Sequence, residues 1–177
     1  MLKVFVDLDG VLTNFKQAVK AIGAESGVME GAAETDKLRM YKAINEAGES
    51  FWSKMNWTED GKKLWDFLKP YRPVLLSSPG DFTDAVAGKQ IWVCRELPGT
   101  TLITEKDKYI YAERNAILID DMKDNVGAWN EAGGVGILHT DFDSTKKRLL
   151  DILEQPKMKA TLAGYLRELS SSLCSLS

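Results

Sequence analysis

The stretch Val4-Phe5-Val6-Asp7-Leu8-Asp9-Gly10-Val11-Leu12 decides the fold of this 177-residue chain. Its apolar residues predict a buried strand that ends at two carboxylates one residue apart, before the chain turns at a glycine. Side chains alternate along an extended chain, so Asp7 and Asp9 point to one side while Leu8 points into the core. In α/β proteins, this edge of a parallel sheet is the usual place for a ligand.

A second apolar run, residues 116–119, ends in the same way at Asp120 and Asp121. One acid pair alone could be a strand end followed by an Asp-Gly turn, but turn chemistry does not explain two such strands. Clustered carboxylates repel one another unless a cation or a proton compensates their charge. Mg²⁺ takes hard oxygen ligands and often a substrate phosphate, so the two pairs predict a magnesium site. One aspartate could then attack phosphorus, and another, if protonated, could protonate the leaving oxygen.

These motifs resemble the signatures of the haloacid dehalogenase (HAD) superfamily of phosphohydrolases, and they occur in that family's order. Asp7-Leu8-Asp9-Gly10-Val11-Leu12 resembles the first signature, and Val74-Leu75-Leu76-Ser77-Ser78-Pro79 resembles the second. Lys106 or Lys108 could supply the third. Ile119-Asp120-Asp121, with Asn125 after it, resembles the fourth.

Within the superfamily, the 5'(3')-deoxyribonucleotidase group is the most similar. The similarity rests on Leu76-Ser77-Ser78-Pro79, on Asp107-Lys108 and on Leu118-Ile119-Asp120-Asp121. The chain departs from that group in having Ser77 where the group has threonine. It also has about two extra residues between Lys108 and Asp120, counted against the group's spacing.

The resemblance implies a role for each acid. Asp7 would be the nucleophile that forms an aspartyl-phosphate, and Asp9 would protonate the leaving alkoxide and later deprotonate water. Mg²⁺ would be held by Asp7, the backbone carbonyl of Asp9 and Asp121, with Asp120 as an adjacent ligand.

The resemblance also implies a set of phosphate-binding residues: Ser77, Ser78, Lys108 and Lys106. Lys108 is preferred over Lys106 because it follows an aspartate, as in the family's Asp-Lys pair. Two alternatives stay open from the residues themselves. The serines before Pro79 could cap a turn, and either lysine could simply be solvated.

The fold class expected from the resemblance is α/β, with a Rossmann-like HAD core and a central parallel sheet of about five strands in the order 3-2-1-4-5. The expected strands are residues 2–7, 73–77, 101–104, 116–119 and 135–138. The interval between the first two strands is too long for a normal connection and carries helical signals. We therefore expect a core domain of residues 1–12 and 70–177, and an inserted helical cap of residues 13–69.

Three large aromatic residues stand close together in the expected cap, in Phe51-Trp52-Ser53-Lys54-Met55-Asn56-Trp57. By the resemblance, Phe51, Trp52 and Trp57 are candidates for a substrate pocket that stacks a nucleobase. The alternative, that these rings form the apolar core of the cap, weighs equally, because a small helical cap needs a core of its own.

Composition and charge exclude several other classes. A formal net charge of -3 provides no basic field for a nucleic-acid polymer. Two cysteines are too few for a disulfide scaffold or a zinc site. We find no signal peptide and no apolar stretch of roughly 20 residues. We therefore expect a cytoplasmic location and no association with a membrane. The serine-rich residues 170–177 resemble a flexible tail.

The predicted function is a magnesium-dependent phosphomonoesterase. Its expected partner is a small-molecule phosphate ester, first of all a (deoxy)ribonucleoside 5'-monophosphate, and a homodimer is compatible with the prediction. A sugar phosphate or phosphoglycolate is the alternative within the class. A regulatory protein that accepts a phosphoryl group or binds a ligand without turnover is the alternative of another class.

Overall fold

Five parallel strands form one sheet in the order β3-β2-β1-β4-β5 in the computed structural model, which describes residues 2–29 and 31–174. The strands are β1 (Lys3–Val6), β2 (Val74–Ser77), β3 (Leu102–Thr104), β4 (Ala116–Asp120) and β5 (Val135–Leu138). The predicted α/β class and the predicted strand order are confirmed.

β4 and all of β1 except Lys3 are buried, as strands at the centre of a parallel sheet are. Val6 pairs with Ile119 in register, and the backbone N–H of Asp7 donates to the carbonyl of Ile119 over 2.9 Å. This register brings the ends of the two strands level with each other. The acids at the ends of both strands therefore share one edge of the sheet.

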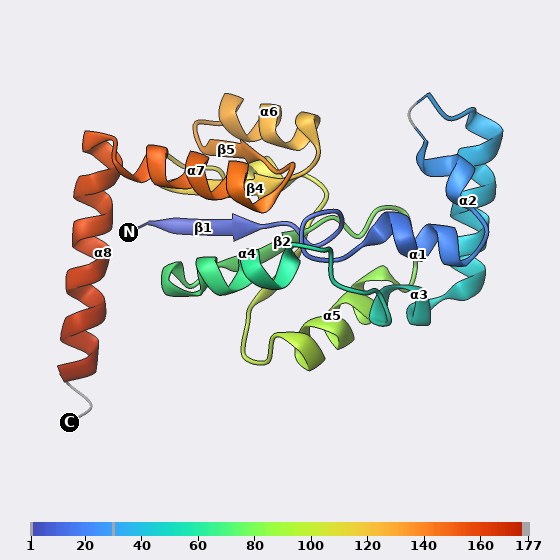
Figure 1. Cartoon of the computed structure of the whole chain (residues 1–177), viewed down its shortest axis with the longest axis horizontal. Helices are drawn as coiled ribbons and strands as arrows, with labels where there is room; N and C mark the ends of the chain where they lie inside the picture. The colour runs from blue at the N-terminus through green and yellow to red at the C-terminus, as the bar shows by residue number, and fades with distance from the viewer. Residues whose placement is uncertain (1, 30, 175–177) are drawn as a thin grey trace.

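The helices lie on both faces of the sheet and at its two ends (Figure 1). Between β1 and β2 the helices are α1 (Phe15–Ala21), η1 (Glu25–Val28), α2 (Glu34–Ala47), α3 (Glu49–Ser53), α4 (Gly61–Leu68) and η2 (Lys69–Tyr71). After β2 they are α5 (Ala85–Glu96), η3 (Lys108–Tyr111), α6 (Lys123–Glu131), α7 (Phe142–Leu153) and α8 (Pro156–Cys174). In Figure 1 the β1 arrow points toward α1, α2 and α3, while α8 lies at the opposite end.

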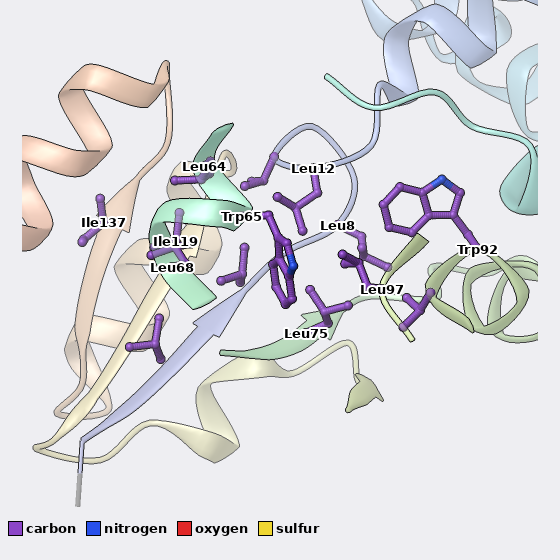
Figure 2. Packing of buried hydrophobic residues seen from close by; sticks show 14 of the residues in the cluster. Leu8, Leu12, Leu64, Trp65, Leu68, Leu75, Trp92, Leu97, Ile119 and Ile137 are labelled. Carbon is purple, nitrogen blue, oxygen red and sulfur yellow. The ribbon is translucent and has the colours of Figure 1, made fainter. Parts of the chain in front are cut away.

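The larger apolar core joins one face of the sheet to α4, α5 and α7. Figure 2 shows Trp65, Leu64 and Leu68 of α4 in one cluster with Leu75 of β2 and Leu8. The helix α4 falls within the range 13–69 that the sequence assigns to a cap, yet its buried face packs with the core. We propose that the cap comprises α1 to α3 only, and that α4 belongs to the core domain.

The last part of the expected cap is fastened to the core through α5. Gly88 of α5 faces α3 so closely that a Cβ on it would lie 2.5 Å from Cβ of Trp52. Trp92 donates its indole N–H to the carbonyl of Met55 over 2.8 Å, and Arg95 donates to the carbonyl of Ser53 over 2.6 Å. The α3 segment therefore has a fixed place beside α5.

The C-terminal segment differs from the expectation. Residues 170–174 continue the helix α8 instead of starting a flexible tail, and residues 175–177 lie outside the described residues. Met158 and Tyr165 of α8 are buried against the core, which gives the helix an anchored beginning. Among the described helices, none combines the length and the apolar character that crossing a membrane requires.

Substitution of Gly88 should separate close packing from helix propensity. Gly88→Ala is expected to lower the free energy of unfolding by about 1–3 kcal/mol, because the added methyl group overpacks the contact with α3. Gly127→Ala is the matched control: Gly127 is also helical, but nothing lies within 4 Å of its missing Cβ. That change should raise stability by up to about 1 kcal/mol. Urea denaturation measures both, and equal effects would contradict the close α3–α5 contact.

Candidate functional site

Three carboxylates converge where β1 and β4 end. Asp7, Asp120 and Asp121 each offer an oxygen atom, and these atoms all lie within 4.8 Å of one another. Asp7 and Asp120 are buried, and Asp121 is partly buried. The structure thus brings together the two strand ends whose convergence the sequence predicts. We call these three residues the acid cluster.

Lys108 lies between two members of the acid cluster. Its Nζ is 2.9 Å from Oδ1 of Asp7 and 2.6 Å from Oδ2 of Asp120, and the lysine is 2% exposed. Burial by itself lowers the pKa of Lys108, but the charges of Asp7 and Asp120 outweigh it and raise that pKa. Of the two candidate lysines, Lys108 is therefore the one in the site. Lys106 is exposed and pairs instead with Asp81.

Asp120 is held in place on every side. Its carboxylate accepts hydrogen bonds from the backbone N–H of Met122 over 2.9 Å and from Asn125 over 3.0 and 3.1 Å. Together with Lys108, these donors occupy both of its oxygens. Burial raises the pKa of Asp120, and Asp7 raises it further, while Lys108 lowers it. Asp120 is thus suited to orient its neighbours.

Asp121 has the opposite character, because its Oδ1 is buried and has no hydrogen-bond partner among the described residues. Burial raises the pKa of Asp121 to about 7, and the charges of Asp7 and Asp120 add to the rise. Gly10 makes room for this carboxylate: its φ is +85°, and a Cβ there would lie 2.2 Å from Oδ2 of Asp121. A buried carboxylate oxygen that accepts no hydrogen bond is available to coordinate a metal ion.

Asp9 stands apart from the acid cluster and has its own partners. Its Oδ1 accepts a hydrogen bond from Thr13 over 3.0 Å, and its Oδ2 pairs with Nζ of Lys89 over 2.7 Å. Burial raises the pKa of Asp9, and Asp7 adds to that rise, while Lys89 opposes it. Two acids from one strand end thus have different environments and can have different roles.

Lys89 is the residue that the sequence analysis missed. It is fully buried, and besides Asp9 it donates to Oγ of Ser77 over 3.0 Å and to the carbonyl of Ser78. A lysine in the middle of an amphipathic helix gives no sign of this, since most such lysines are solvated. The one available signal is that Lys89 and Trp92 are three residues apart, on the same face of α5.

The two candidate serines are placed differently. Ser77 is fully buried at the end of β2, with its Oγ at Lys89. The Oγ of Ser78 accepts a hydrogen bond from the backbone N–H of Gly80 over 3.2 Å, which is a turn contact. The alternative of a turn cap therefore describes Ser78, while Ser77 reaches the charged groups.

The three candidate aromatic residues do not share one pocket. Trp52 is buried with its ring centroid 4.9 Å from Nζ of Lys89, so it lies beside the site. Phe51 packs edge-on against Trp52 and against Phe15, with ring centroids 4.9 and 5.7 Å apart. The ring of Trp57 instead lines a separate groove, whose described lining residues include no member of the acid cluster.

The residues present fit a divalent cation. The acid cluster supplies three oxygen donors, one of them buried and without a partner, and a single lysine does not balance three carboxylates. Hard oxygen ligands of this kind suit Mg²⁺ better than a softer metal. Among the described residues, Leu8 and Lys108 both contact Oδ1 of Asp7. Oδ2 of Asp7 is therefore left for a ligand.

Solved structures of hydrolases have a similar fold. A hydrolase from Pseudomonas syringae is 14% identical with a TM-score of 0.50, and the match covers 83% of this chain and 90% of that one. A hydrolase from Streptococcus pneumoniae TIGR4 is 14% identical with a TM-score of 0.51, covering 84% and 97%. An L-2-haloacid dehalogenase from Xanthobacter autotrophicus is 12% identical with a TM-score of 0.54, covering 90% and 86%.

No family model matches the chain, and no curated protein matches it. The structural matches cover most of the chain, and its sheet has the order β3-β2-β1-β4-β5, so the chain has the Rossmann-like HAD fold. At these identities the likeness concerns the fold, and the chemistry has to be argued from the residues.

Asp121 should make the metal-free protein less stable as pH rises. Its pKa is about 7 in the folded chain and 3.8 as a free side chain, so only the folded state binds a proton between these values. Stability is then highest below pH 3.8 for this group and is lost as pH rises through 7. We expect Asp121→Asn in EDTA to be more stable than the parent at pH 8, by up to about 4 kcal/mol.

Thermal unfolding at pH 5 and pH 8 measures this effect. The parent should lose more stability than Asp121→Asn between the two pH values, and Asp151→Asn, an exposed acid on α7, is the control. Identical pH dependence of parent and Asp121→Asn would show that ionisation of the Asp121 carboxylate does not destabilise the folded protein.

Proposed function

We propose that this protein is a magnesium-dependent phosphomonoesterase that acts through an aspartyl-phosphate, with a nucleoside 5'-monophosphate as its first candidate substrate. One observation carries the proposal. Two acids from the same strand end have separate partners, Asp7 in the acid cluster with Lys108 and Asp9 with Lys89 and Thr13. Phosphoryl transfer through a covalent intermediate needs such a division between nucleophile and acid.

Asp7 is the nucleophile in this proposal. Lys108 stabilises its negative charge, and the backbone N–H of Leu8 donates to Oδ1 over 2.8 Å, which fixes the carboxylate. A carboxylate oxygen of Asp7 bonds to phosphorus while the bond from phosphorus to the ester oxygen breaks. The electron pair leaves with the ester oxygen, so this oxygen needs a proton.

Asp9 supplies that proton and takes one back in the second step. It protonates the ester oxygen first and then accepts a proton from water, whose oxygen attacks phosphorus and releases Asp7 and inorganic phosphate. Burial favours the protonated form of Asp9, since it raises the pKa of this acid. A phosphate beside Ser77 would attract Lys89, which weakens the ion pair that opposes protonation.

Mg²⁺ would be held by Asp7, Asp121 and the backbone carbonyl of Asp9, while Asp120 orients the cluster through Lys108 and Asn125. The ion would neutralise charge on the phosphate, as metal ions do in phosphoryl transfer. The partly buried Asp121 must lose its proton to serve as a ligand, so binding should weaken as pH falls.

Phe82 and Tyr41 favour a substrate with a planar leaving group, because they are the accessible end of a row of rings that begins at the buried Trp52. Trp52 lies beside Lys89, and Phe82 packs against Trp52 with ring centroids 5.1 Å apart. Tyr41 of α2 stacks on Phe82 at 5.1 Å and 26°, so aromatic faces lead outward from the site. A nucleobase stacks on such faces, whereas a sugar phosphate has no aromatic ring to stack, and it remains the second candidate.

Phosphate release tests the reaction class and the substrate together. Purified protein with Mg²⁺ should release phosphate from nucleoside 5'-monophosphates faster than from sugar phosphates or phosphoglycolate. Asp7→Asn should lower turnover by about 10⁴-fold or more, because the nucleophile is lost. Asp151→Asn, an exposed acid on α7, should leave turnover unchanged. Release of halide from a haloacid without phosphate release would contradict the proposed reaction.

Lys89 and Lys106 form a matched pair for a second test. Lys89→Met should lower kcat/KM by about 100-fold, because a buried cation near the phosphate is removed. Lys106→Met should retain activity, since Lys106 is exposed and pairs with Asp81. The pH profile should also change in Lys89→Met alone, as Asp9 loses the charge that favours its ionised form. A fully active Lys89→Met would remove Lys89 from the mechanism.

A further inference from the structure

A groove of about 710 Å³ lies at the opposite end of the strands from the acid cluster. Val74 and Thr101 line it where β2 and β3 begin, whereas the acid cluster follows the ends of β1 and β4. One wall is formed by α4 and η2, and the other by the segment that joins α5 to β3. The proposed reaction uses no residue of this groove.

Two residues with indole rings, Trp57 and Trp65, line the groove. The orientation of Trp57 is fixed, because its Nε1 donates to Glu96 over 2.9 Å and its ring packs on Trp92 with centroids 4.8 Å apart. Trp65 is almost fully buried in the core. A ligand ring could therefore stack on Trp57 without first ordering that side chain.

The two carboxylates that line the groove, Asp66 and Glu96, each form an ion pair. Asp66 pairs with Lys69 over 2.6 Å. Glu96 accepts the indole N–H of Trp57 on one oxygen and pairs with Arg95 over 2.8 Å on the other. These contacts leave the groove without an acid that would repel an anion strongly.

Two cations in the groove have no such partner. Lys62 and Arg72 form no ion pair with any residue that the structure describes. Nζ of Lys62 lies 5.8 Å from the ring centroid of Trp57, beside the aromatic face, and Glu96 attracts it without an ion pair. An anionic group near Lys62 would thus lie next to a ring stacked on Trp57.

The backbone at Arg72 supports a role for its side chain. Its φ of 47° and ψ of 60° are left-handed, and among the described residues it is the one non-glycine residue with a positive φ. A glycine would adopt this conformation without strain. The guanidinium therefore stands at a position that the turn itself would fill better with glycine, and strain of this kind concentrates at ligand sites.

We infer that this groove binds an anion with a planar ring, of the nucleoside monophosphate class, with the ring on Trp57 and the phosphate attracted by the positive charges of Lys62 and Arg72. The volume is in the range of small-molecule sites, roughly 300–1,000 Å³. A ring and a phosphate are the two features that the groove offers partners for. The inference concerns a second site and holds whether or not the acid cluster hydrolyses nucleotides.

Calorimetric titration with adenosine 5'-monophosphate (AMP) tests the second site. The parent is Asp7→Asn with Mg²⁺, which should not consume the ligand, and the test variant adds Lys62→Glu and Arg72→Glu. We expect about two AMP per chain in the parent and one in the test variant, since one of two sites is lost. If the acid cluster does not bind nucleotides, the change is from one to none, which still supports the groove.

A test variant that binds as many AMP molecules as its parent would overturn the inference. The matched control adds Lys20→Glu and Arg148→Glu, two exposed cations outside the groove, and it should bind as the parent does. Unfolding curves of all three proteins show whether they fold alike.

A single substitution and two partial ligands complete the test. Arg72→Gly removes the guanidinium and relieves the backbone, so it should fold as the parent does and yet bind AMP more weakly in the groove. Adenosine lacks the phosphate and ribose 5-phosphate lacks the nucleobase, so both should bind this site less tightly than AMP. Equal binding of ribose 5-phosphate would contradict the stacking on Trp57.

Discussion

The charge of Lys108 is the constraint on which the proposed site depends. Two buried carboxylates, Asp7 and Asp120, share this one ammonium group, and the third, Asp121, forms no ion pair with any of the described residues. If all three acids were ionised, the cluster would carry an excess of negative charge in a poorly solvated place. The protein alone can relieve this by holding a proton on Asp121, and a divalent cation relieves it better.

The helix α5 connects the parts of the molecule that matter for function. It presents Lys89 to Asp9, Gly88 to α3 and Glu96 to the groove. Lys89 and Glu96 are seven residues apart, about 10 Å along a helix, so the proposed site and the groove lie at the two ends of one rigid element. A ligand at either end contacts residues held by the same helix.

The helices between β1 and β2 differ in how they are attached to the rest of the protein. The segment of α3 is clamped to α5 through Gly88 and the hydrogen bonds of Trp92 and Arg95. The helices α1 and α2 extend away from the sheet in Figure 1, and α2 reaches back through Tyr41, which stacks on Phe82. In the proposed reaction, α2 is the element that would contact the leaving group through Tyr41, whereas α3 is held in place by α5.

The sequence by itself determined the sheet and the acid cluster. Apolar runs that end in acid pairs place Asp7 and Asp121 at one edge of a parallel sheet, because parallel strands end on the same side. What only the tertiary structure decided were contacts between elements far apart in the chain. Lys89 has ordinary local surroundings in the sequence, the aromatic stretch that contains Trp57 does not say which ring faces the site, and periodicity does not say which helix face meets which neighbour. Packing of α5 buries Lys89 beside Asp9 and turns Trp57 toward Glu96, since burial and pairing are properties of the folded chain.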